Sequence, residues 1–144
     1  MNPFLARIKR GLGQVDIFTG SKAEGRIVNH LMHSYDITGQ VLVISSPRFM
    51  FRFKDTLLEL EPTGLIDVKS CNVSIARMVF SKLGSRESIL NFITRPAGLT
   101  SKMRGMRADH VFILDWELMT PELQQSVGAM RACNPDMTFT CIGD

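Results

Sequence analysis

Residues 111–117 read Val111-Phe112-Ile113-Leu114-Asp115-Trp116-Glu117, and this stretch decides the fold class. Its apolar run ends on an aspartate, and a second carboxylate follows two positions later. A continuous apolar run of this kind is typical of a strand buried on both faces of a parallel sheet. Because open α/β sheets bind ligands at the carboxyl ends of their strands, Asp115 is a candidate site residue. The alternative is a core strand whose last residue only starts the next turn.

The composition bounds the class of protein. The 144 residues, 44% hydrophobic and 22% charged, predict one globular domain over residues 1–144. No apolar run approaches the roughly 20 residues that cross a membrane, and the N-terminus lacks the apolar core of a signal peptide. The three cysteines have no C-x-x-C spacing, so neither a disulfide framework nor zinc is indicated. We therefore expect a reducing cytoplasm, which is the host's if the chain is viral.

Positive charge is unevenly distributed along the chain. Residues 1–54 hold eight Lys and Arg against three Asp and Glu, whereas residues 55–144 hold nine against eleven. Within the second part, an acid-free basic cluster is formed by Arg95, Lys102, Arg104 and Arg107. Such a cluster attracts phosphates and is a candidate contact for nucleic acid, although basic clusters are also common on solvated faces.

The first half of the chain predicts alternating helices and strands. Apolar residues at helical spacing indicate a short helix over residues 4–12, and Val15–Thr19 reads as a strand that stops at Gly20. A second amphipathic helix follows the loop at residues 21–25, and residues 40–46 form a buried strand. A strand, a helix and a strand in succession make a βαβ unit, which implies a parallel pair.

The second half continues the alternation. Residues 48–60 fit either an edge strand or a helix, and we favour a helix that ends before Pro62. Further strands are expected at residues 65–71, 88–94 and 137–142, with helices at residues 73–83 and after the Thr120-Pro121-Glu122 start signal. The predicted fold class is a three-layer α/β sandwich with a mainly parallel sheet of about five to six strands.

The loop after the first strand has the glycine spacing of a phosphate-binding loop. It reads Gly20-Ser21-Lys22-Ala23-Glu24-Gly25-Arg26-Ile27, against the pattern G-x-x-x-x-G-K-[ST]. Both glycines are at the required positions, where the backbone must curl so that successive N–H groups point at phosphate oxygens. Arg26 keeps the positive charge of the lysine but is bulkier, and Ile27 cannot ligate a metal. Glu24 adds a negative charge that opposes a polyphosphate.

The opening stretch fits a second element of nucleotide hydrolysis. In P-loop NTPases an apolar strand ends in an Asp that holds Mg²⁺, and a following Glu polarises the attacking water. Asp115 is correctly placed, but Trp116 occupies the position of that Glu. Glu117 lies one residue further, so its side chain starts from the opposite face of an extended segment unless a tight turn follows Asp115.

The chain resembles the core of helicases and of viral large-terminase packaging ATPases. In those proteins a strand with a Thr/Gly loop leads through an Arg-Gly-x-x-x-Asp segment into the Walker B strand, as Phe92–Leu99, Arg104–Asp109 and Val111–Asp115 do here. Thr140–Asp144 is similar to the helicase strand that ends in Gly-Asp. Val41–Pro47 resembles the strand that, in helicases, leads towards bound nucleic acid.

This resemblance implies a degenerate P-loop NTPase domain, encoded by a virus or mobile element, with weak or absent ATP hydrolysis. The expected cofactors are ATP and Mg²⁺, and the expected partner is nucleic acid or a motor protein. The implied site residues are Gly20, Ser21, Lys22, Gly25 and Arg26 for nucleotide, Asp115 and Glu117 for catalysis, Asp115 for metal, and Arg95, Lys102, Arg104 and Arg107 for phosphate contacts.

Two other functions remain open. One is a non-catalytic interaction scaffold that acts as an inhibitor or decoy of a related motor. The other is an active NTPase completed by homo-oligomerisation, because helicases need a second domain to supply an arginine to the ATP site.

Overall fold

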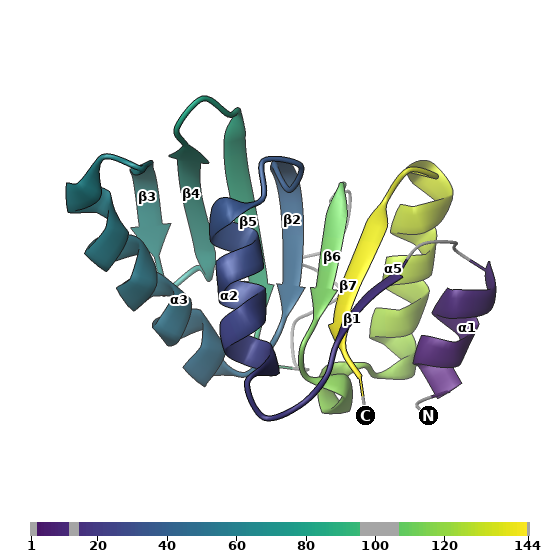
Figure 1. The fold of residues 1–144 in the computed structure, drawn as a ribbon. Coiled ribbons are helices and arrows are strands. Elements are labelled where there is room, and N and C mark those ends of the chain that lie inside the picture. Colours follow the sequence, from purple (N-terminus) through teal and green to yellow (C-terminus); the bar gives the residue numbers. More distant parts are fainter. Residues whose placement is uncertain (1–2, 12–14, 96–106, 144) are drawn as a thin grey trace.

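A seven-stranded sheet organises the chain, with helices on both of its faces (Figure 1). The computed structural model describes residues 3–11, 15–95 and 107–143. The strands are β1 (Val15–Phe18), β2 (Gly39–Ile44), β3 (Ile66–Asn72), β4 (Arg77–Lys82), β5 (Glu87–Ile93), β6 (His110–Ile113) and β7 (Thr138–Ile142). The helices are α1 (Pro3–Gly11), α2 (Ala23–His33), α3 (Pro47–Leu60) and α5 (Pro121–Cys133), with short 3₁₀ turns η1 (Glu61–Thr63) and η2 (Trp116–Leu118).

The sheet is mainly parallel, as predicted. Its strand order is β1-β7-β6-β2-β5-β4-β3, and the first five strands in that order run parallel. Among the described strands only β4 runs in the opposite direction, since it pairs antiparallel with both β3 and β5. Strands β1 and β2 are parallel as expected of a βαβ unit, but β7 and β6 lie between them, so they do not pair directly.

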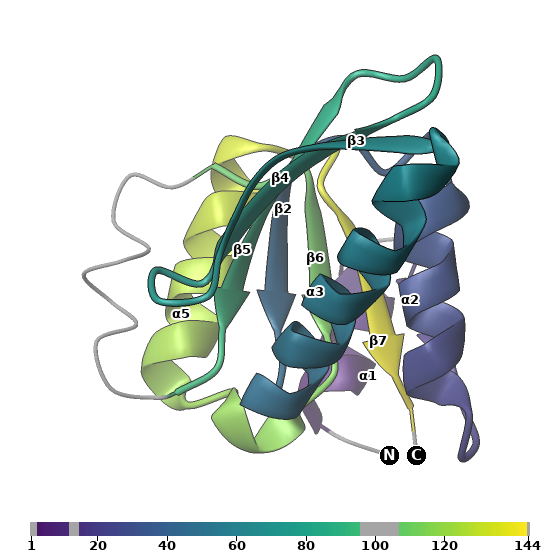
Figure 2. The same cartoon turned by 90° about the vertical axis from the view of Figure 1, so that its left-hand side faces the viewer.

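The layers follow from the alternation of side chains along the central strands. Leu42 and Ile44 of β2 pack with the cluster that contains α1 and α5, whereas Val41 and Val43 pack with α2 and α3. Figure 2 shows α5 on one side of the sheet and α2 and α3 on the other. This arrangement confirms the three-layer sandwich. In the part of the chain that the structure describes, no helix has the length and apolar character needed to span a bilayer.

The segment after β2 is a helix, which resolves the ambiguity of residues 48–60. Ser46 caps it, since its hydroxyl accepts a hydrogen bond from the Phe49 N–H at 3.4 Å, and Pro47 takes the first helical position. Phe49, Phe53 and Leu57 are buried at helical spacing against the sheet. The helix ends before Pro62, as expected.

The helix predicted for residues 73–83 is wrong, because this segment forms a turn and strand β4. Met78, Phe80 and Lys82 are buried while the residues between them are more exposed, which is a period of two. The turn is built by Asn72, whose side-chain oxygen accepts hydrogen bonds from the N–H groups of Ser74 and Ile75. The resulting hairpin adds β4, which is antiparallel to both of its neighbours, and the outer strand β3 to the parallel sheet.

Strand β3 forms the outer edge of the hairpin and is irregular. Its pairing with β4 shifts register between Val68 and Ser70, which marks a β-bulge. Charged side chains flank the bulge, where Lys69 Nζ and Asp67 Oδ2 lie 3.5 Å apart and both side chains are exposed.

Polar contacts fix the amino ends of β2 and β6. The Gln40 N–H donates to Asp109 Oδ2 at 2.9 Å, and the Asp109 N–H donates to the Gln40 carbonyl at 2.7 Å. Gly39 makes this pair possible: it has a φ of 87°, and a Cβ there would lie 2.4 Å from Asp109 Oδ2. The side-chain amide of Asn134 also donates to the Ala108 carbonyl at 3.0 Å, which ties α5 to the same end of the sheet.

Lys82 joins the hairpin to the end of α2. The side chain is only 4% exposed, and its ammonium donates to the carbonyl of Ile37 at 3.0 Å and to the carbonyl of Ser34. Ser34 is the C-cap of α2, so the positive charge lies where the helix dipole is negative. Burial nevertheless lowers the pKa of Lys82 from 10.5 to about 8.

We predict that this buried lysine makes the free energy of unfolding change with pH in the alkaline range. Between the folded pKa near 8 and the unfolded pKa near 10.5, the unfolded chain holds a proton that the folded chain has released. The free energy of unfolding should therefore rise with pH, by about 2 kcal/mol between pH 8 and pH 10. Urea unfolding at these two pH values tests this, with Lys82→Met expected to lose the rise and exposed Lys69→Met expected to keep it. An equal rise in both variants would show that Lys82 is not the group responsible.

Candidate functional site

The carboxyl edge of the parallel sheet gathers most of the residues singled out by sequence. Since β1, β2, β5, β6 and β7 run in the same direction, the segments that follow them meet at one edge. These segments contain Gly20 after β1, Ser45 after β2, Arg95 after β5, Asp115 after β6 and Gly143 after β7. This edge is the candidate site.

Asp115 is held firmly at this edge by its own backbone and side chain. Its N–H donates to the Ile44 carbonyl at 3.2 Å, directly beside the end of β2. Its carboxylate accepts a hydrogen bond from the Glu117 N–H at 3.1 Å and so caps the η2 turn. Asp115 therefore starts the next turn, as in the alternative interpretation of residues 111–117.

Trp116 has a structural role at the position where related ATPases carry a glutamate. Its indole Nε1–H donates to the Ile142 carbonyl at 2.7 Å, which ties η2 to the end of β7. The ring packs edge-on against Phe4 of α1, with centroids 5.8 Å apart. The tight turn that the sequence left open does follow Asp115, and it places the exposed Glu117 just beyond the strand end. A catalytic role for Asp115 and Glu117 stays a prediction.

The glycine loop has a different geometry from the one its spacing suggests. Strand β1 ends at Phe18 and α2 begins at Ala23, so only Thr19–Lys22 form the loop. Gly20, with a φ of 95°, makes the turn, and the Ala23 N–H donates to the Gly20 carbonyl at 3.2 Å. Gly25 lies in the first turn of the helix, where its backbone does not curl around a phosphate.

The two residues after Gly25 do not fit a magnesium nucleotide held in the manner of a P-loop. Arg26 folds back: its Nη1 donates to the Thr19 carbonyl at 3.2 Å, and its guanidinium lies 5.0 Å from the Phe18 ring centroid. Ile27 is fully buried in the core under α2. Neither residue reproduces the lysine and hydroxyl that hold a γ-phosphate and Mg²⁺.

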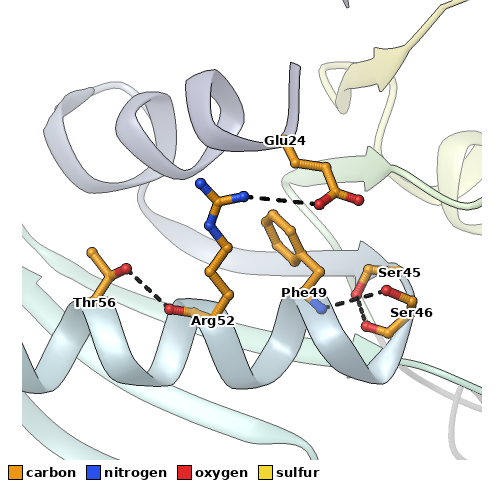
Figure 3. A network of polar contacts seen from close by, with 6 residues as sticks. All are labelled: Glu24, Ser45, Ser46, Phe49, Arg52 and Thr56. Atoms are coloured by element: carbon orange, nitrogen blue, oxygen red, sulfur yellow. Dashed lines mark hydrogen bonds and ion pairs between the residues drawn. The ribbon is translucent and has the colours of Figure 1, made fainter. Parts of the chain in front are cut away.

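A cleft of about 750 Å³ opens beside this loop, between α2 and α3. Lys22 and Arg26 line it from the α2 side, and Arg48 and Arg52 line it from α3. Glu24 faces Arg52 across the cleft with a 4.0 Å ion pair (Figure 3). Sequence reasoning missed Arg48 and Arg52, although their spacing of four on a helix signals two cations on one face.

The two described members of the predicted basic cluster lie at opposite edges of the sheet. Arg95 is exposed just after β5, at the carboxyl edge, whereas Arg107 is exposed just before β6, at the amino edge. Lys102 and Arg104 lie outside the described residues. Phosphate contacts by these four residues stay a prediction.

The residues that the structure describes contain no group of three or more His, Cys, Asp or Glu side chains that could hold a metal ion. Magnesium bound by one carboxylate takes its other ligands from water and substrate phosphates. Metal ligation by Asp115 stays a prediction.

The mostly parallel sheet, its strand order and an aspartate at the end of β6 fit a P-loop NTPase-like fold. No family model and no curated protein matches the chain. Solved structures of phage large terminases do match. The ATPase domain of the Thermus phage P74-26 large terminase has a TM-score of 0.61 at 11% identity, covering 99% of this chain and 64% of that one.

The large terminase of a thermophilic bacteriophage has a TM-score of 0.62 at 10% identity, and covers 93% of this chain. A structure of that terminase with ATP-γ-S has a TM-score of 0.58 at 11% identity and covers 97% of this chain. In both cases the match spans 34% of the phage protein. The chain thus has the fold of terminase ATPase domains, as its sequence predicted, and spans about a third of the whole phage protein.

We predict that Asp115 stabilises the carboxyl edge through its capping hydrogen bond, separately from any catalysis. Asp115→Ala should lower the free energy of unfolding by about 1 kcal/mol, since the Glu117 N–H loses its acceptor. Asp115→Asn keeps a side-chain oxygen and should lose clearly less. Urea denaturation at pH 7 compares the two, and equal stability of both variants would contradict the capping role.

Proposed function

We propose that the chain is a terminase-type domain that binds nucleic acid or a motor protein, with weak or absent ATP hydrolysis. The observation that carries the proposal is the start of α2 at Ala23, which takes Gly25 and Arg26 into the helix. With Ile27 buried beneath them, the loop lacks the phosphate cradle and the metal hydroxyl that hydrolysis requires. A viral or mobile-element origin and a cytoplasmic site of action belong to the same proposal.

The fold nevertheless keeps features that suit a phosphate-rich partner. The carboxyl edge presents Arg95 in solvent, and Arg48 begins α3 at the same edge. Ser46 and Pro47 place the positive end of the α3 dipole there. These charges support binding of a nucleic-acid backbone at the edge where Asp115 lies.

The first test is hydrolysis. Phosphate release from ATP with Mg²⁺ should be no faster for the wild-type chain than for an Asp115→Ala, Glu117→Gln double variant, because the loop does not position the nucleotide. The assay should be run over a range of protein concentrations. A rate that rises with concentration and is abolished in the double variant would instead favour an active NTPase completed by oligomerisation.

The second test is nucleic-acid binding. Arg95→Ala should weaken binding of single-stranded or duplex DNA and reduce the slope of log K against log salt by about one, as expected for one lost phosphate contact. Fluorescence anisotropy measures both quantities. Exposed Lys69→Ala, on the outer strand β3, is the matched control and should change neither. If the wild-type chain binds no DNA at low salt, the interaction-scaffold function replaces this proposal.

A further inference from the structure

The cleft between α2 and α3 gathers positive charge. Lys22, the N-cap of α2, and Arg26 line it on one side, and Arg48 and Arg52, one turn apart on α3, line it on the other. Like charges at the spacing of Arg48 and Arg52 destabilise a helix. Among the described residues that line the cleft, Glu24 alone opposes them. This arrangement stores repulsion that an anion would relieve.

Arg52 is the member of this group with the least favourable position. A Cβ at Gly25 would lie 3.0 Å from Arg52 Nη2, so the guanidinium rests against the first turn of α2. That turn is the positive end of the helix dipole. The absence of a side chain at Gly25 lets the guanidinium approach this turn closely. A negative group between Arg52 and the start of α2 would be attracted to both.

Glu24 occupies part of that position in the absence of a ligand. Its carboxylate lies 4.0 Å from Arg52 Nη1, and the side chains are 44% and 53% exposed (Figure 3). Exposed pairs at this distance are weak and screened by salt. Phosphate oxygens accept two hydrogen bonds from one guanidinium and carry more charge than a carboxylate, so they compete well for the arginine.

We propose that this cleft is a binding site for the clustered phosphates of a nucleotide-sized ligand, with Arg48 and Arg52 as its main contacts. Glu24 acts as an internal competitor that the ligand displaces from Arg52. The cleft volume, about 750 Å³, lies within the roughly 300–1,000 Å³ of small-molecule sites. The site needs neither Mg²⁺ nor Asp115, and it does not depend on the role proposed for Arg95.

Calorimetry with inorganic pyrophosphate in EDTA at low salt tests the site. We expect saturable binding by the wild-type chain, weakened roughly tenfold or more in Arg52→Ala and in Arg48→Ala, the loss expected for a charged hydrogen bond. Glu24→Gln should tighten binding by roughly two- to fivefold, because the ligand no longer competes with a carboxylate. If Glu24 and Arg52 formed only a structural ion pair, Glu24→Gln would not increase the affinity for pyrophosphate.

Arg77→Ala is the matched control, since it removes an exposed arginine that does not line the cleft, and should bind as the wild type does. Circular dichroism confirms that each variant is folded. The proposal is overturned if the wild-type chain shows no saturable heat, if Arg52→Ala binds as Arg77→Ala does, or if Glu24→Gln weakens binding.

Competition then identifies the source of the phosphates. ATP in EDTA and an oligo-dT strand are compared as competitors of pyrophosphate at equal phosphate content. If ATP displaces pyrophosphate at the lower concentration, the ligand is a free nucleotide. If oligo-dT does so, the ligand is a nucleic-acid backbone. This readout is separate from hydrolysis and from the Arg95 measurement, so the failure of one proposal is distinguishable from the failure of the other.

Discussion

The geometry of the carboxyl edge depends on the register of β2 against β6. Both strands are buried on both faces, and residues such as Val43, Ile44 and Phe112 are fully inaccessible. An apolar run of this kind favours burial but does not itself define a register, because a slip exchanges one apolar residue for another. Polar contacts at the two ends of the strands define the register, which the apolar residues alone leave open. Asp109 pairs with Gln40 at the amino end, and the N–H groups of Leu114 and Asp115 both reach the Ile44 carbonyl at the carboxyl end.

The elements that sequence predicted well are those with signals both inside them and at their ends. Helix α5 begins with Thr120-Pro121, in which a hydroxyl cap precedes a proline at the first helical position. Residues 48–60, whose apolar pattern fits both a strand and a helix, form α3 after the same kind of start, Ser46-Pro47. The buried strands were recognisable from their uninterrupted apolar residues. The helix prediction for residues 73–83 failed because apolar residues such as Ile75, Val79 and Leu83 are spaced as on a helical face. In the structure the buried residues are Met78, Phe80 and Lys82, which alternate along a strand. Asn72 was the available turn signal.

The candidate site was predictable in outline but not in geometry. An aspartate after an apolar strand was enough to place Asp115 at the ligand-binding edge of the sheet. The spacing of Gly20 and Gly25 could not show where α2 begins, and that start decides whether the backbone encloses a phosphate. Gly25 instead lies against a side chain 27 residues away, Arg52, and one sequence holds no trace of that contact. Tertiary packing therefore gives a different local structure to a glycine spacing that is typical of a phosphate-binding loop.

The irregular edge of β3 has a consequence for how the molecule can associate. A regular outer strand offers a row of free N–H and C=O groups on which a strand from another molecule can pair, a common route to aggregation. The bulge between Val68 and Ser70 interrupts that row, and the charges of Asp67 and Lys69 would have to lose water on pairing. The hairpin thus ends the sheet on this side with an edge that disfavours pairing with a strand of another molecule.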